Sequence, residues 1–213
     1  MGKILLSLTL AFIAGCASKP SELSWTDYQE WLQKNGQAVA REKVINDLKL
    51  RAQFLPADFL AYSEYEQLTS AKTGTFDSLL KEYKCGLSFK LSLLADKQTT
   101  NLMYHGISTM NEYKQRVSLL SFNSEQFIAL NVGDDRFKPV LTAFEGYNEL
   151  SNRLTFSVVF TPDGYHCGVF DEHAEELTLT FDDPYWGTGT SHFLFRKSDI
   201  QSIPKLIIAK RSL

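Results

Sequence analysis

Apolar side chains recur with the period of an amphipathic helix in the segment that follows Ser24. Ser24 is a typical N-cap residue, Asp27 lies three positions later as its capping-box partner, and Asn35-Gly36 is a stop signal. The apolar stripe consists of Trp25, Tyr28, Trp31 and Leu32. The pattern therefore predicts a helix of about ten residues.

Three further helices are predicted from local patterns. A short helix follows Pro56 and continues through Tyr62, because proline suits a first helical turn. Residues 76–83 carry apolar side chains at positions i, i+3, i+4 and i+7, with Thr75 as the cap. Residues 108–117 form the third candidate.

Alternation with period two dominates the chain after Gly86. One strand precedes that point, at residues 48–54, and a hairpin is predicted where Pro162-Asp163-Gly164 turns the chain into residues 165–169. The other predicted strands cover residues 87–93, 128–132, 140–144, 154–160, 177–181 and 193–195. Because no strand-helix-strand alternation is sustained, we expect an α+β fold, predominantly antiparallel β and sandwich-like, with short helices in the N-terminal third.

The first residues have a different pattern. Lys3 precedes the apolar stretch 4–13, which is far shorter than the ~20 residues of a membrane-spanning helix and has the length of a signal-peptide core. The motif Ile13-Ala14-Gly15-Cys16 that follows resembles the lipobox of bacterial lipoproteins. The alternative is an ordinary or uncleaved signal with a chance cysteine.

The lipobox resemblance implies a location. Residues 1–15 would be the signal peptide, Cys16 the lipid attachment site, and residues 16–23 a short lipidated tether ahead of a single β-rich domain at 24–213. Two or three acyl chains hold a protein at a membrane effectively permanently. Ala17, rather than aspartate, follows the cysteine, and family rules then favour the outer membrane, with the domain facing either the periplasm or the surface.

Charge and composition exclude some partners. The chain has 22 basic and 25 acidic residues, a net charge of −3, and no basic block, which argues against nucleic acid. We expect the membrane, through Cys16, and a protein of the envelope as partners. No motif indicates a cofactor, since Gly187 and Gly189 lack the strand-loop-helix context of a phosphate loop.

Cys85 and Cys167 are the only other cysteines, and each is followed by glycine. Export to an oxidising compartment makes a disulfide between them a candidate. The loop it closes, about 80 residues long, would stabilise the fold by roughly 4–5 kcal/mol. The alternative is two unpaired buried cysteines.

The densest polar cluster runs from His166 to Glu176 and includes His173. His166 and His173 are weak metal-ligand candidates, because their spacing matches no H-x-x-x-H pair on a helix. The simpler interpretation is a polar strand face followed by a solvated acidic turn.

The loop after residue 181 combines carboxylates with aromatic rings. Asp182, Asp183, Tyr185 and Trp186 are candidate ligand-binding residues, since exposed aromatic rings stack on sugars and on partner side chains. Alternatively, Tyr185 and Trp186 fold back to plug the open end of a sheet.

Catalytic motifs are weak in this sequence. No G-x-S-x-G is present, and the neighbours His166 and Cys167 would point to opposite faces of a strand. We therefore expect a non-enzymatic binding or assembly module on a membrane anchor. The rival hypothesis is a lipid-anchored hydrolase or metal-binding module that uses residues 166–183.

Overall fold

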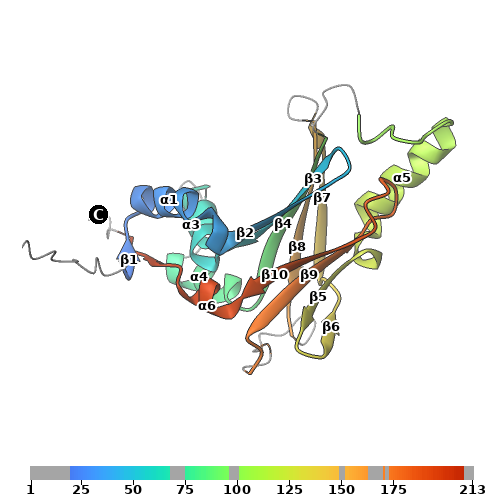
Figure 1. Cartoon of the computed structure of the whole chain (residues 1–213). Helices are drawn as coiled ribbons and strands as arrows, with labels where there is room; N and C mark the ends of the chain where they lie inside the picture. The colour runs from blue at the N-terminus through green and yellow to red at the C-terminus, as the bar shows by residue number, and fades with distance from the viewer. Residues whose placement is uncertain are drawn as a thin grey trace, which may run out of the picture.

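Two antiparallel sheets lie face to face in the computed structural model, which describes residues 20–67, 75–95, 101–148, 152–162, 170 and 173–208 (Figure 1). We call them together the β sandwich. The five-stranded sheet has the order β2 (Ala40–Ile45), β3 (Leu48–Leu55), β4 (Leu87–Ala95), β8 (Arg153–Phe160) and β7 (Leu141–Asn148). The four-stranded sheet has the order β10 (Thr190–Arg196), β9 (Glu176–Asp182), β5 (Ile128–Val132) and β6 (Asp135–Phe137).

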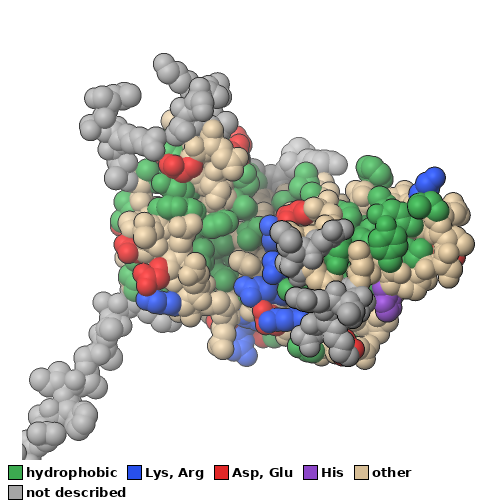
Figure 2. Space-filling view, turned by 90° about the horizontal axis from the view of Figure 1, so that it is seen from above, with side chains coloured by type: hydrophobic (Ala, Val, Ile, Leu, Met, Phe, Trp, Pro, Cys, Tyr) green, Lys and Arg blue, Asp and Glu red, His purple; other side chains and the backbone are tan. Residues whose placement is uncertain are grey.

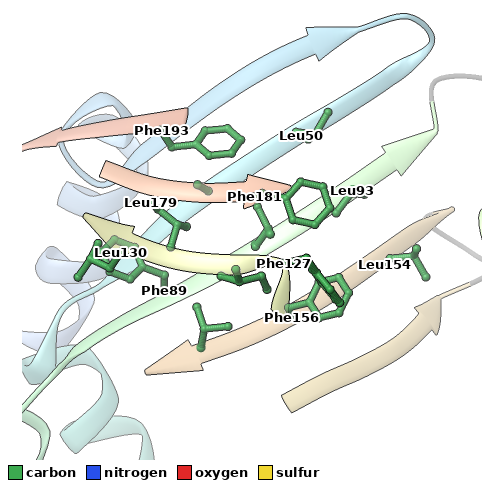
Figure 3. Close-up of a cluster of buried hydrophobic side chains, with 14 of the residues drawn as sticks. Leu50, Phe89, Leu93, Phe127, Leu130, Leu154, Phe156, Leu179, Phe181 and Phe193 are labelled. Atoms are coloured by element: carbon green, nitrogen blue, oxygen red, sulfur yellow. The ribbon is translucent and has the colours of Figure 1, made fainter. Parts of the chain in front are cut away.

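The core lies between the two sheets. In β3 the apolar Leu50 and Ala52 are fully buried, while Arg51 between them lies on the outer face, as the two-residue period of a strand requires. Figure 3 shows the inward side chains of both sheets gathered in one cluster. The ring centroid of Phe89 on β4 lies 5.2 Å from that of Phe195 on β10, so the sheets are in direct contact.

A group of helices lies at one end of the sandwich (Figure 1). We call it the helical lobe, and it comprises α1 (Trp25–Lys34), α3 (Ala57–Gln67), α4 (Phe76–Tyr83) and the parallel pair β1 (Glu22–Leu23) and β11 (Lys205–Leu206). The ring of Trp25 on α1 stacks on that of Tyr62 on α3 at a centroid distance of 4.3 Å. The pairing of β1 with β11 brings both ends of the described chain to this lobe.

The remaining helices connect or cover the strands. They are α2 (Gly36–Val39), α5 (Met110–Phe122), the 3-10 helix η2 (Ser124–Gln126) and α6 (Lys197–Gln201). In Figure 1, α5 lies at the end of the molecule opposite the helical lobe. It has Thr109 as N-cap and Glu112 as the capping-box partner.

The α+β class with mainly antiparallel strands is confirmed, and so are several local predictions. α1 begins after the Ser24 cap, and α4 begins after the Thr75 cap. The helix predicted at residues 108–117 is α5. It continues to Phe122 and lies outside the N-terminal third of the chain. The first strand of the predicted hairpin is β8, whereas most of its turn and its second strand fall on residues 163–169, which lie outside the described part of the chain.

The sequence pattern does not predict β2. Its inward positions include Arg41 and Lys43, so the strand lacks the alternation of apolar residues that marks a half-buried strand. A two-residue turn with Asn46 at φ 55° connects it to β3. Short, weakly apolar elements such as β6 and the β1–β11 pair are likewise not predicted.

Candidate functional site

A groove lies between β2 and β10, the edge strands of the two sheets on one side of the sandwich. We call it the edge groove. Its cavity has a volume of about 340 Å³. A second cavity of about 650 Å³ shares Arg41, Arg196 and Asp199 with it.

Arg41 joins the two sheet edges at one end of this groove. Its Nε donates to the carbonyl of Leu194 at 2.6 Å, and its Nη2 pairs with the Asp199 carboxylate at 2.9 Å. Nη1 donates to the carbonyls of Gln37 and Ala40. Arg41 therefore satisfies carbonyls on both edges and holds β2 against β10, with its charge compensated by Asp199.

The other cations of the groove have fewer partners. Lys43 Nζ lies 5.8 Å from the centroid of the Phe193 ring and has no ion pair among the described residues. Arg196 Nε lies 3.8 Å from the Glu176 carboxylate, and both side chains are well exposed, so this contact is weak. The groove thus presents two cations that are not firmly neutralised.

Glu42 lines the same groove but is engaged on the outer face of the sheet. Its carboxylate pairs with Lys49 Nζ at 2.7 Å and with Arg51 Nη1 at 2.9 Å. The hydrogen bond from Lys49, aided by Arg51, lowers the pKa of Glu42 against the opposing effect of partial burial. Glu42 is therefore ionised but does not neutralise Lys43.

His192 of β10 also lines the groove, and its ring is held from one side. Its Nδ1 lies 3.2 Å from Thr180 Oγ1, which in turn accepts a hydrogen bond from Asn131 Nδ2 at 2.9 Å. The chain of contacts crosses β10, β9 and β5. The imidazole is therefore oriented before any ligand arrives.

The loop after β9 contains the candidate ligand residues, and Asp183 organises it. Asp183 Oδ1 accepts from the backbone N–H groups of Tyr185 and Trp186, each at 2.8 Å. Oδ2 accepts from the N–H and the hydroxyl of Thr188. Both oxygens are thus used by the loop itself, while Asp182 accepts from the Thr190 hydroxyl at 2.9 Å. This network gives Asp183 a structural role in the turn.

The two aromatic residues of the loop, Tyr185 and Trp186, pack inward and do not extend into solvent. Trp186 is only 4% exposed, and its Nε1 donates to the Leu102 carbonyl at 2.9 Å. Tyr185 is half-buried and lies under the guanidinium of Arg116, 4.3 Å from its ring centroid. A buried indole is not available to stack on a ligand at the surface, and ligand binding by the other residues of this loop stays a prediction.

Arg116, on α5, is the partner that sequence reasoning missed. It is 4% exposed, and its two Nη groups donate to the carbonyls of Leu102, Met103 and His105 at 2.7–3.1 Å. Burial lowers its pKa, although nearby Tyr185 and Asp183 oppose that shift. A signal was present, because Arg116 interrupts the apolar stripe of Tyr113, Val117 and Leu120 at helical spacing.

The metal and carboxylate hypotheses concern residues that the structure covers only in part. His166, Asp171 and Glu172 lie outside the described residues, whereas His173 and Asp182 lie within them. Within the described ranges, no group of three or more His, Cys, Asp or Glu side chains is placed to hold a metal ion. Binding of a metal by His166 and His173 stays a prediction.

The structure describes one of the three cysteines. Cys16 and Cys167 lie outside the described residues, and Cys85 is half-buried in the turn between α4 and β4. Leu87 pairs with Phe160, so continuing this register would set Cys85 opposite Pro162, five positions before Cys167. A Cβ on Gly86 would lie 2.7 Å from the Phe160 carbonyl, so these two segments approach closely. The disulfide stays a prediction.

An exposed apolar surface surrounds α5. Met110 and Phe122 are 66% and 77% exposed, and the ring of Tyr104 stacks on that of Tyr113 at 5.0 Å. Figure 2 shows hydrophobic side chains gathered at this end of the molecule. This is the kind of surface expected of a module that contacts another protein.

None of the helices in the described part of the chain has the length and apolar character needed to span a bilayer. No protein-family model and no curated protein matches the chain. A solved structure from Burkholderia pseudomallei, described as a novel protein of unknown function, aligns with 86% of this chain and 94% of its own, at 13% identity and a TM-score of 0.34.

Proposed function

We propose that the protein is a lipid-anchored lipoprotein of the outer membrane whose β-rich body is a non-enzymatic binding module. The observation that carries the proposal is Ile13-Ala14-Gly15-Cys16 directly after a short apolar stretch. The first described strand, β1, begins at Glu22, so five residues separate it from Cys16. A fully extended segment of that length reaches about 17 Å. The helical lobe would then lie close to the lipid surface.

A binding role for the body is supported by its two surfaces. The edge groove offers cations with weak partners, and the apolar surface around α5 lies at the opposite end from the helical lobe. Both carboxylate oxygens of Asp183 are occupied by its own loop, which does not favour acid-base chemistry there. We assign the edge groove as the ligand-binding surface.

The anchor is tested by replacing its attachment site. Cys16→Ser should move the protein out of the membrane fraction and abolish incorporation of labelled palmitate. Ser18→Ala leaves the motif intact and is the matched control. Retention of Cys16→Ser in the membrane fraction, with the same fatty-acid content as the wild type, would contradict the proposal.

A further inference from the structure

The edge groove has a charge that differs from that of the whole chain. The chain carries a net charge of −3, yet the groove contains Lys43 and Arg196 beside Arg41. Both of its carboxylates already have partners: Asp199 pairs with Arg41 inside the groove, and Glu42 pairs with Lys49 and Arg51. The groove therefore has a local excess of positive charge that an anion would neutralise.

The two strands and the His192 ring that form this groove are held in place. Arg41 fixes the spacing of the two strands through the Leu194 carbonyl, and the Lys43 ammonium lies over the Phe193 ring. The His192 ring is held by Thr180. Because the strands and the ring are positioned in advance, little ordering is needed when a ligand binds.

We propose that the edge groove binds a phosphate group, with Lys43, His192 and Arg196 as its ligands. A phosphate monoester carries about −1.5 to −2 charges at neutral pH, which matches the two weakly paired cations better than a single carboxylate does. Arginine recognises phosphate oxygens through two parallel hydrogen bonds. Leu194, which is 40% exposed, provides an apolar contact for the organic part of the molecule. This inference rests on the proposed binding function of the same groove.

An opposing interpretation is that Arg41 and Lys43 only protect the sheet edges. Charges that point inward from an edge strand prevent another chain from pairing with it. That role requires no ligand. It predicts that phosphate changes the reactivity of Lys43 no more than chloride does at equal ionic strength.

Lysine footprinting of the detergent-purified lipoprotein distinguishes these interpretations. The rate at which acetic anhydride modifies Lys43 is measured by mass spectrometry in inorganic phosphate and in chloride. At phosphate about ten times its Kd, modification of Lys43 should slow about tenfold. Lys114, exposed on α5, is the internal control and should not change. Equal rates for Lys43 in both salts would overturn the proposal.

A pair of variants tests the role of the groove directly. Arg196→Gln should weaken phosphate protection of Lys43 about tenfold, because a charge-assisted contact is lost. Arg153→Gln removes the same charge from the exposed outer face of β8 and should leave the protection unchanged. Equal protection in both variants would overturn the assignment of Arg196.

Lipid vesicles distinguish a phosphate that belongs to a lipid headgroup from one that belongs to a soluble molecule. The protein is reconstituted in phosphatidylcholine with or without phosphatidic acid, whose headgroup is a phosphate monoester, and Lys43 is footprinted again. Protection by phosphatidic acid supports a lipid headgroup as the source, and protection by inorganic phosphate alone supports a soluble phosphate monoester. These readouts do not depend on Cys16, so loss of the anchor proposal and loss of the phosphate proposal give different results.

Discussion

Phe89 in the β sandwich and Trp25 in the helical lobe both contact several rings, but their surroundings differ. Phe89 is fully buried and meets Phe54, Phe160 and Phe195, which come from both sheets. Trp25 stacks on Phe59 and Tyr62 but is only half-buried. The sandwich is thus stabilised by apolar area removed from water, whereas the lobe relies more on stacking and helix caps.

Charge separates the same two regions. In the elements of the helical lobe, acidic side chains (Glu22, Asp27, Glu30, Asp58, Glu64, Glu66, Asp77 and Glu82) outnumber basic ones (Lys34, Lys81 and Lys205). In the strands of the sandwich, basic side chains (Arg41, Lys43, Lys49, Arg51, Lys90, Arg136, Arg153 and Arg196) outnumber acidic ones (Glu42, Asp135, Glu145, Glu176 and Asp182). We expect the two regions to differ in stability, in pH response and in the ligands they attract.

The largest expected effect concerns the junction between the regions. If Cys85 and Cys167 are bridged, reduction or Cys85→Ser should lower the free energy of unfolding by about 4 kcal/mol, because a long loop is released in the unfolded chain. Urea denaturation with and without reductant measures this. Two free thiols in the unreduced mature protein, besides any at Cys16, would contradict the bridge.

Truncation of the sandwich core should destabilise the whole protein. Phe89→Ala removes a fully buried ring and should lower the free energy of unfolding by about 4 kcal/mol. Phe122→Ala, at a side chain 77% exposed, is the matched control and should change it by less than about 0.5 kcal/mol. An equal effect of both would show that this cluster is not the main source of stability.

The same truncation in the helical lobe should act locally. Trp25→Ala should destabilise the lobe by about 2 kcal/mol, because the lost ring is half-buried and stacked. Hydrogen exchange should accelerate in α1 and α3 and stay unchanged in β4 and β8. Uniform acceleration across all strands would indicate that lobe and sandwich unfold as one unit.

The helical lobe should lose stability at high pH and the sandwich at low pH. Burial, together with the hydrogen bond from its hydroxyl to Glu64, raises the pKa of Tyr83 to about 12, and burial beside Asp58 raises that of Tyr28. Their contribution is complete below the ordinary tyrosine pKa of about 10 and declines as pH rises through the folded value. The lobe should therefore loosen first in alkali.

In acid the sandwich should lose stability. Burial alone would raise the pKa of Glu145, but hydrogen bonds from Ser157 and Lys90 lower it overall. That contribution is present above about pH 4.5 and is lost as pH falls through the lowered folded value. Circular dichroism across pH, with Tyr83→Phe and Glu145→Gln, checks both signs. An alkaline transition unchanged in Tyr83→Phe would exclude this origin.

The smallest expected effect is a gain in stability. Tyr28 is fully buried on α1, and its hydroxyl has no hydrogen-bond partner among the described residues. Tyr28→Phe removes a polar group that is buried without compensation, so it should stabilise the lobe by about 1 kcal/mol. Thermal unfolding measures this shift. A loss of stability would show that the hydroxyl is satisfied in solution, for example by water.

Local sequence patterns determined most of the elements. Ser24 and Thr75 mark the starts of α1 and α4 because a cap satisfies backbone N–H groups of the next turn. The alternation in β3 and β8 also reports burial on one face. The cysteine at position 16 is likewise a local signal, and its lipidation stays a prediction from the sequence alone.

Only the tertiary structure decided the candidate site. Arg41 reaches Leu194 and Asp199, more than 150 positions away, and no local pattern indicates which strands become neighbouring edges. The inward packing of Trp186 likewise depends on the Leu102 carbonyl, 84 positions away. Contacts between neighbours in the chain can be inferred from caps and periods, whereas contacts between distant segments arise only when the two sheets pack around a common core.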